Sequence, residues 1–126
     1  MRTLSSLLLA GVIVTPGVAL AGPYDGTYHG TLTGADGNAN TCVKQAPVQM
    51  TVADNKLTYN HLSNATVTSN VAADGSFSGS AISKYTAGRT GPLNLTLDGK
   101  ISGDRITAVS KVSGYCTYNL QLQKFR

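Results

Sequence analysis

The chain of 126 residues is long enough for one small domain, and charged side chains make up only 13% of it. Ten Lys and Arg stand against six acidic residues, which gives a net charge of +4. This excess is small and spread thinly, so ordinary solubility accounts for it and it does not by itself identify an acidic partner. Every acidic residue is an Asp, and the other polar residues are mostly Ser, Thr, Asn and Gln, as is common in exported β proteins.

The first 21 residues have the pattern of a secretory signal peptide. Met1-Arg2 is a short positive start, an apolar stretch runs from Leu4 to Val14, and Ala19-Leu20-Ala21 supplies a signal-peptidase pattern. The alternative is an N-terminal membrane anchor, but this apolar run is shorter than the ~20 residues needed to span a bilayer. We therefore expect cleavage of 1–21 and a single domain, 22–126, that is periplasmic or secreted and not membrane-embedded.

Four similar turn signals recur along this domain. Each has an Asp-Gly or Asp-Asn pair, which tolerates positive φ and marks a hairpin between alternating runs. The four copies are Asp25-Gly26-Thr27-Tyr28, Asp54-Asn55-Lys56-Leu57, Asp74-Gly75-Ser76-Phe77 and Asp98-Gly99-Lys100-Ile101. They predict a β-meander. In the last copy Leu97, Gly99 and Ile101 stay in phase, so we expect the turn at Gly103-Asp104 and a bulge or bend at Asp98-Gly99.

Apolar and polar residues alternate with period two between these turns, as in half-buried strands. No amphipathic helix is expected after residue 24. The eight expected strands are centred on 27–32, 48–52, 57–60, 66–71, 77–81, 93–97, 106–110 and 118–122.

Two cysteines lie in this domain, Cys42 and Cys116. In an oxidising compartment an even pair indicates a disulfide, and the alternatives are a metal site or a reactive thiol. Eight consecutive strands can close as a barrel or stack as a sandwich. In an up-and-down barrel the loop after the first strand and the start of the last strand lie at one end, where the two cysteines fall. We therefore predict an all-β, eight-stranded antiparallel up-and-down β-barrel closed by one disulfide.

The two ends of this barrel are expected to differ. Short turns occupy one end, whereas two long connections, 34–46 and 83–92, occupy the other. Function on β scaffolds is often carried by such loops. The second connection holds Lys84, Tyr85 and Arg89, the densest basic and aromatic cluster in the chain, which we take as candidate binding residues. A flexible solvated loop is the alternative interpretation.

The inward faces also change along the barrel. They are bulky near the short turns, whereas toward the long loops they include Gly30, Ser69, Gly79, Ala81, Ala108 and Ser110. This gradient indicates a closed floor and a partly open mouth, with Tyr59, His61 and Tyr118 as candidate binding groups on the wall. Alternatively, the small residues relieve crowding where the strands coil.

No arrangement of residues in the sequence indicates catalysis. Paired carboxylates, a nucleophile elbow and a phosphate-binding glycine loop are not found, so we expect no enzyme, no cofactor and no metal ligands. Nucleic-acid binding would need several exposed aromatics interleaved with Lys or Arg, and only the 83–92 cluster approaches that pattern. We therefore expect no nucleic-acid partner.

The opening Gly26-Thr27-Tyr28, followed by a meander, is similar in layout to the avidin and lipocalin barrels, whose first strand carries a Gly-x-aromatic motif near the closed end. This chain lacks the Trp that those families use there, and no ligand-site residue is carried over. With its Asp-Gly-x-Tyr start and two cysteines, the domain more closely resembles small exported bacterial barrel proteins of unassigned function. That resemblance implies fold and compartment only.

These features lead us to expect a non-enzymatic exported binding protein that acts through the long-loop end of the barrel. One version carries a small ligand in the barrel mouth. The other binds a protein or glycan partner through the loops, for example as an inhibitor of a secreted or periplasmic hydrolase. A structural role in the envelope is the remaining alternative.

Overall fold

A computed structural model describes residues 22–37, 42–62, 65–83, 93–112 and 116–125. The predicted signal peptide therefore lies outside the described residues. These residues form eight strands, as predicted, and most are longer than the alternation alone indicated. They are β2 (Gly26–Gly37), β3 (Gln45–Ala53), β4 (Lys56–His61), β5 (Ala65–Asn70), β6 (Ser76–Ser83), β7 (Leu93–Ser102), β8 (Arg105–Val112) and β9 (Cys116–Lys124).

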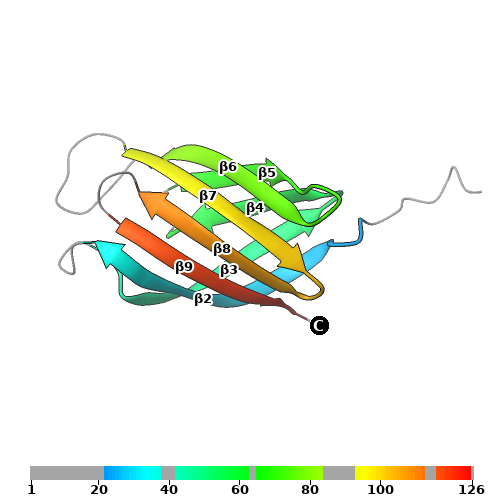
Figure 1. The fold of residues 1–126 in the computed structure, drawn as a ribbon, viewed down its shortest axis with the longest axis horizontal. Helices are drawn as coiled ribbons and strands as arrows, with labels where there is room; N and C mark the ends of the chain where they lie inside the picture. The colour runs from blue at the N-terminus through cyan, green and yellow to red at the C-terminus, as the bar shows by residue number, and fades with distance from the viewer. Residues whose placement is uncertain (1–21, 38–41, 63–64, 84–92, 113–115, 126) are drawn as a thin grey trace, which may run out of the picture.

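The strands form one antiparallel sheet in the order β5-β4-β3-β2-β9-β8-β7-β6. Sequential strands are hydrogen-bonded neighbours except β5 and β6, which stand at the two ends of this order. The first strand, β2, also pairs with the last, β9, so the sheet curls into the barrel of Figure 1. The predicted up-and-down barrel is confirmed. The described part of the chain contains no helix long and apolar enough to cross a membrane.

The turns follow the predicted positions. Asp54 and Asn55 both have positive φ, and so do Gly75 and Gly103. The pair Asp98-Gly99 lies inside β7, with the turn after it at Gly103, as predicted. Of the two alternatives there, the bulge is wrong, because Gly99 pairs in register with both Phe77 and Ala108. The bend stays a prediction. A register shift does occur in the ladder between β2 and β9, where it lies between Gly34 and Asp36.

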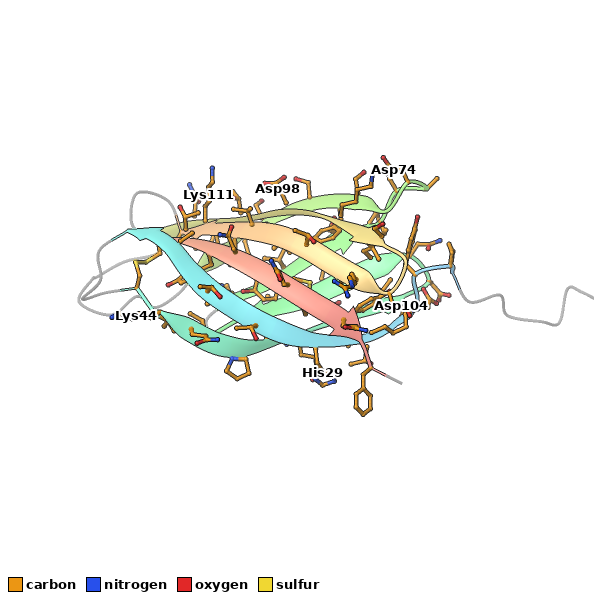
Figure 2. All side chains as sticks on the ribbon, turned by 60° about the horizontal axis from the view of Figure 1, so that its bottom comes forward. His29, Lys44, Asp74, Asp98, Asp104 and Lys111 are labelled. Carbon is orange, nitrogen blue, oxygen red and sulfur yellow. A yellow bond between two sulfur atoms is a disulfide. The ribbon has the colours of Figure 1, made fainter. Side chains whose placement is uncertain are left out.

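The core lies inside the barrel and takes inward-facing side chains from every strand. Its largest fully buried members include Tyr28, Tyr59, Leu32, Met50, Leu57, Leu95, Leu97, Ile101, Ile106 and Leu120. Charged side chains such as Asp74, Asp98 and Lys111 lie on the outside (Figure 2). This in-and-out division is the one that period-two alternation predicts.

Two inward glycines permit unusually close contacts between strands. A Cβ on Gly30 would overlap the backbone oxygen of Gln121 in β9. A Cβ on Gly79 would lie 2.8 Å from Val67 Cγ1 and 2.9 Å from the Thr68 oxygen in β5. At these two positions glycine is needed for strand approach, which supports the crowding interpretation for Gly30 and Gly79.

The short-turn end is tied together by the segment before β2. The Asp25 carboxylate accepts hydrogen bonds from the N–H groups of Asp54 (3.0 Å) and Asn55 (3.3 Å). The Asp54 bond is the largest cause of the lowered pKa of Asp25. The Tyr24 hydroxyl donates to the carbonyl of Ala73 at 2.8 Å. These bonds connect three turns at the short-turn end of the barrel.

The barrel has one weak seam, between β5 and β6. No paired register joins these two strands among the described residues, although they lie beside each other. The Ser69 hydroxyl bridges them: it donates to the Ser78 carbonyl at 2.8 Å and accepts from the Ser78 N–H at 3.0 Å. One backbone bond, from Ala72 N–H to the Ser76 carbonyl, follows at the end of the seam. A side chain therefore replaces part of a backbone ladder.

The predicted disulfide is confirmed. Cys42 and Cys116 are bonded, with Cα atoms 5.7 Å apart, and the bond joins the loop after β2 to the start of β9. It lies at the long-loop end of the β2–β9 ladder, where Gly37 pairs with Cys116. A disulfide is typical of an oxidising, extracytoplasmic compartment.

We expect the double variant Cys42→Ala and Cys116→Ala to lose about 4 kcal/mol of unfolding free energy, since the bond spans 74 residues of sequence. Alanine is used because a serine hydroxyl at the buried Cys116 would add a separate cost. Urea unfolding with and without reductant measures the loss, and reduction of the wild type should reproduce it. A wild type insensitive to reductant would contradict the prediction.

We expect Ser69→Ala to lower the unfolding free energy by about 1–3 kcal/mol, because both backbone groups of Ser78 lose their partner. Hydrogen exchange at the Ser78 amide should accelerate more than exchange elsewhere in β6. Ser80→Ala, at an exposed position on β6, is the matched control. It should change neither the unfolding free energy nor the exchange of the Ser78 amide appreciably. Equal effects of the two variants would show that Ser69 does not hold the seam.

Candidate functional site

Three of the predicted binding residues come together inside the barrel near its long-loop end. Tyr59 and His61 lie two residues apart on β4, so both side chains point inward, and Tyr118 points inward from β9. The other three predicted binding residues, Lys84, Tyr85 and Arg89, lie outside the described residues.

The three side chains make direct contacts with one another. The Tyr59 hydroxyl and His61 Nδ1 are 2.7 Å apart, and the His61 and Tyr118 ring centroids are 5.4 Å apart. All three are at most 2% exposed. The Tyr118 hydroxyl accepts a hydrogen bond from the N–H of Val43 at 3.3 Å, next to the disulfide. The site is therefore anchored to the closure of the barrel.

A fourth inward-facing polar residue, Ser110, belongs to this site. Alternation along β8 identifies Ser110 as an inward polar residue but does not mark it as a binding candidate. It is 0% exposed, and among the described residues its Oγ has no hydrogen-bond partner. Alternation gave its direction, but only the packed structure shows that its hydroxyl is unsatisfied. We refer to Tyr59, His61, Ser110 and Tyr118 as the interior polar cluster.

The interior polar cluster is uncharged at neutral pH. Burial lowers the pKa of His61 to about 4, so its ring is neutral. Burial also raises the pKa of Tyr59, so its hydroxyl keeps its proton. The nearby Ser110 hydroxyl partly offsets that rise, although its placement relative to Tyr59 does not meet hydrogen-bond geometry. The cluster offers neutral donors and acceptors within an apolar interior.

Such a site is suited to hydrogen bonding with a small uncharged group. A charged ligand would lose its hydration without an opposite charge in the cluster to compensate. The cluster contains no Asp or Glu that could orient His61 as a general base. Within the described ranges, no group of three His, Cys, Asp or Glu side chains gathers to hold a metal ion.

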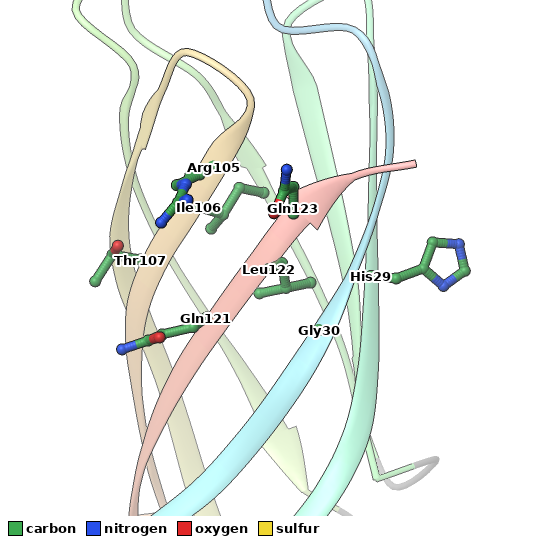
Figure 3. Close-up of a pocket in the computed structure, with 8 residues that line it drawn as sticks. All are labelled: His29, Gly30, Arg105, Ile106, Thr107, Gln121, Leu122 and Gln123. Carbon is green, nitrogen blue, oxygen red and sulfur yellow. The ribbon is translucent and has the colours of Figure 1, made fainter. Parts of the chain in front are cut away.

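Two depressions lie on the outer wall of the barrel. One, of about 280 Å³, lies over β2, β8 and β9 and is lined by residues that include His29, Gly30, Arg105, Thr107 and Gln121 (Figure 3). The other, of about 340 Å³, is lined by residues of β3 and β4 that include Pro47, Gln49 and Asn60. Neither includes a predicted binding residue.

No protein-family model, curated protein or solved structure matches the chain. The function is therefore inferred from the geometry of these sites.

We expect the stability of the folded protein to fall as the pH drops from 6.5 to about 4, because of His61. Burial lowers its pKa from 6.5 to about 4, so in this range the unfolded chain binds a proton that the folded chain does not. The full stability is present above pH 6.5, and the loss amounts to about 3 kcal/mol. Asp25 and Asp74, whose pKa values lie below 3.8, act at lower pH.

Urea unfolding as a function of pH measures this loss. His61→Gln should remove most of the decline, whereas His29→Gln, at an exposed outer position, should leave it in place. An unchanged decline in His61→Gln would mean that another group causes it.

Proposed function

We propose that the protein is a non-enzymatic, exported binding protein, periplasmic or secreted, that takes a small uncharged ligand at the long-loop end of its barrel. The disulfide supports the compartment. The unsatisfied Ser110 hydroxyl supports the site most directly, because an isolated buried hydroxyl costs about 1–3 kcal/mol unless a ligand or water satisfies it.

The rest of the interior polar cluster supports the same function. The neutral His61 ring has a second nitrogen besides the one that contacts Tyr59, and the aromatic faces of His61 and Tyr118 lie near each other. Few polar groups on an otherwise apolar wall are typical of small-molecule sites. Eight-stranded barrels are of a size that holds one small ligand.

One alternative is an inhibitor of a secreted or periplasmic hydrolase that acts through the loops 34–46 and 83–92. A structural role in the envelope remains if neither the cluster nor the loop variants change any interaction. Lys84, Tyr85 and Arg89 would carry that contact. The two proposals differ in the residues on which binding depends, so variants of the cluster and of the loop separate them.

We expect native mass spectrometry of protein purified gently from an exported fraction to show added mass that is lost on denaturation. Ser110→Ala should weaken retention of that mass on the order of tenfold, the effect of about one hydrogen bond. Ser80→Ala is the control and should retain it. Alanine at Lys84, Tyr85 and Arg89 should leave retention unchanged, and retention lost only in that triple variant would favour the loop alternative.

A second measurement tests the site without its ligand. In the empty protein Ser110→Ala removes an unsatisfied buried hydroxyl. The unfolding free energy should therefore stay unchanged or rise by up to about 1 kcal/mol. Ser110 is preferred to a bulky substitution at Ala108, since the Ala108 methyl and the Phe77 ring already occupy the space beside Gly99. A destabilised Ser110→Ala and a protein without added mass would contradict the proposal.

A further inference from the structure

The outer surface of three adjacent strands carries polar side chains in regular rows. His29 of β2 is opposite Gln123 of β9, which is opposite Arg105 of β8. In the next row Thr31, Gln121 and Thr107 are aligned in the same way. We call these six residues the outer polar face: His29, Thr31, Arg105, Thr107, Gln121 and Gln123.

The outer polar face is hollowed. The depression of about 280 Å³ runs over it, and Gly30, Ile106 and Leu122 also line that depression. In Figure 3, Arg105 and Gln123 lie at the hairpin end of the depression, with Thr107 and Gln121 farther along the same strands. His29 lies on the other side, on β2. Amide, hydroxyl and guanidinium groups therefore lie on the strands that line this depression.

An exposed aromatic ring borders this face. Phe125 is 68% exposed, the most exposed of the large hydrophobic side chains in the described part of the chain. It is held in place, since its N–H donates to the Thr27 carbonyl at 2.7 Å and its ring packs edge-on against His29 with centroids 5.1 Å apart. A fixed, exposed ring beside a polar hollow can pack against the apolar face of a sugar.

The charge of the outer polar face is positive. None of its six residues is acidic, and Arg105 carries a permanent positive charge. Lys100, opposite Thr107 on β7, extends the row with a second cation. A planar guanidinium binds a carboxylate through two parallel hydrogen bonds, so a carboxylate-bearing ligand is complementary to this end of the hollow.

The arrangement fits a sugar chain better than a peptide or a nucleic acid. An extended peptide adds to a free sheet edge, but β2, β8 and β9 are each paired on both sides. Single-stranded nucleic acid is bound by several stacked aromatics along a basic groove, whereas this face has one ring at its border. Rows of Gln and Thr match the many hydroxyl groups of a sugar.

We propose that the outer polar face binds an acidic polysaccharide whose sugars carry carboxylates. Arg105 pairs with a carboxylate, Gln121, Gln123 and Thr107 bond to ring hydroxyls, and Phe125 packs against one sugar ring. This surface lies on the outside of the wall and is separate from the interior polar cluster, so it goes beyond the ligand proposed for the barrel interior.

The test is binding of alginate, a polymer of uronic acids, to the full mature protein, measured by isothermal titration calorimetry at low and moderate salt. Arg105→Gln and Phe125→Ala should each weaken binding about tenfold, and neutral dextran should bind far more weakly than alginate. Lys111→Gln is the matched control: it removes the same charge from the same strand outside the hollow and should change the affinity less than about twofold.

Other outcomes would overturn the proposal. Equal losses from Arg105→Gln and Lys111→Gln, or binding of sulfated dextran as tight as that of alginate, would mean unspecific attraction to the net positive charge. No alginate binding by the wild type would also exclude it. Arg105 and Phe125 are exposed, so thermal unfolding should show both variants folded. Ser110→Ala should leave alginate binding unchanged, which separates this test from that of the barrel interior.

Discussion

Nine residue pairs join β2 to β9, more than any other described pair of strands has, and both sites depend on this ladder. At one end the disulfide fixes the loop after β2 to the start of β9, two residues before Tyr118 of the interior polar cluster. Toward the other end of the ladder, Gly30 allows β9 to approach β2 closely, and it also lines the outer depression. The same ladder therefore positions hydrogen-bonding groups on the inside of the wall and polar rows on the outside.

The barrel is asymmetric in how its polar groups are satisfied. At the short-turn end, Asp25 and Tyr24 bond to backbone groups of neighbouring turns. Along the seam, Ser69 satisfies both backbone groups of Ser78. Near the long-loop end, Ser110 is buried without such a partner. Buried polar groups in proteins are nearly always hydrogen-bonded. The Ser110 hydroxyl is therefore the group in this barrel that most needs an explanation.

The fold was predictable from sequence because alternation and Asp-containing turns are local signals. They located eight strands and the inward direction of Tyr59, His61 and Tyr118. The cysteine pair followed from the even number of cysteines and from the strand order of a closed barrel. Register is not local: the strand shift at Gly34, the seam at Ser69 and the contact of Gly30 with β9 depend on how the sheet coils. The orphan hydroxyl of Ser110 and the row of His29, Gln123 and Arg105 depend on that register, so alternation alone could not identify either one.

Closure by the first and last strands has a consequence for how the chain folds. Strands β2–β5 and β6–β9 form two meanders built from local hairpins, and no described ladder joins β5 to β6. The two meanders are joined by the ladder between β2 and β9. The residues paired there are about as far apart in the sequence as the domain allows. Contacts this distant slow folding, because a long loop must be ordered before they form. Until β9 has been synthesised, β2 has a bare edge, and such edges promote misassembly. The pairing of the first and last strands thus closes the barrel, and in the folded chain it holds Cys42 and Cys116 at the distance of a disulfide.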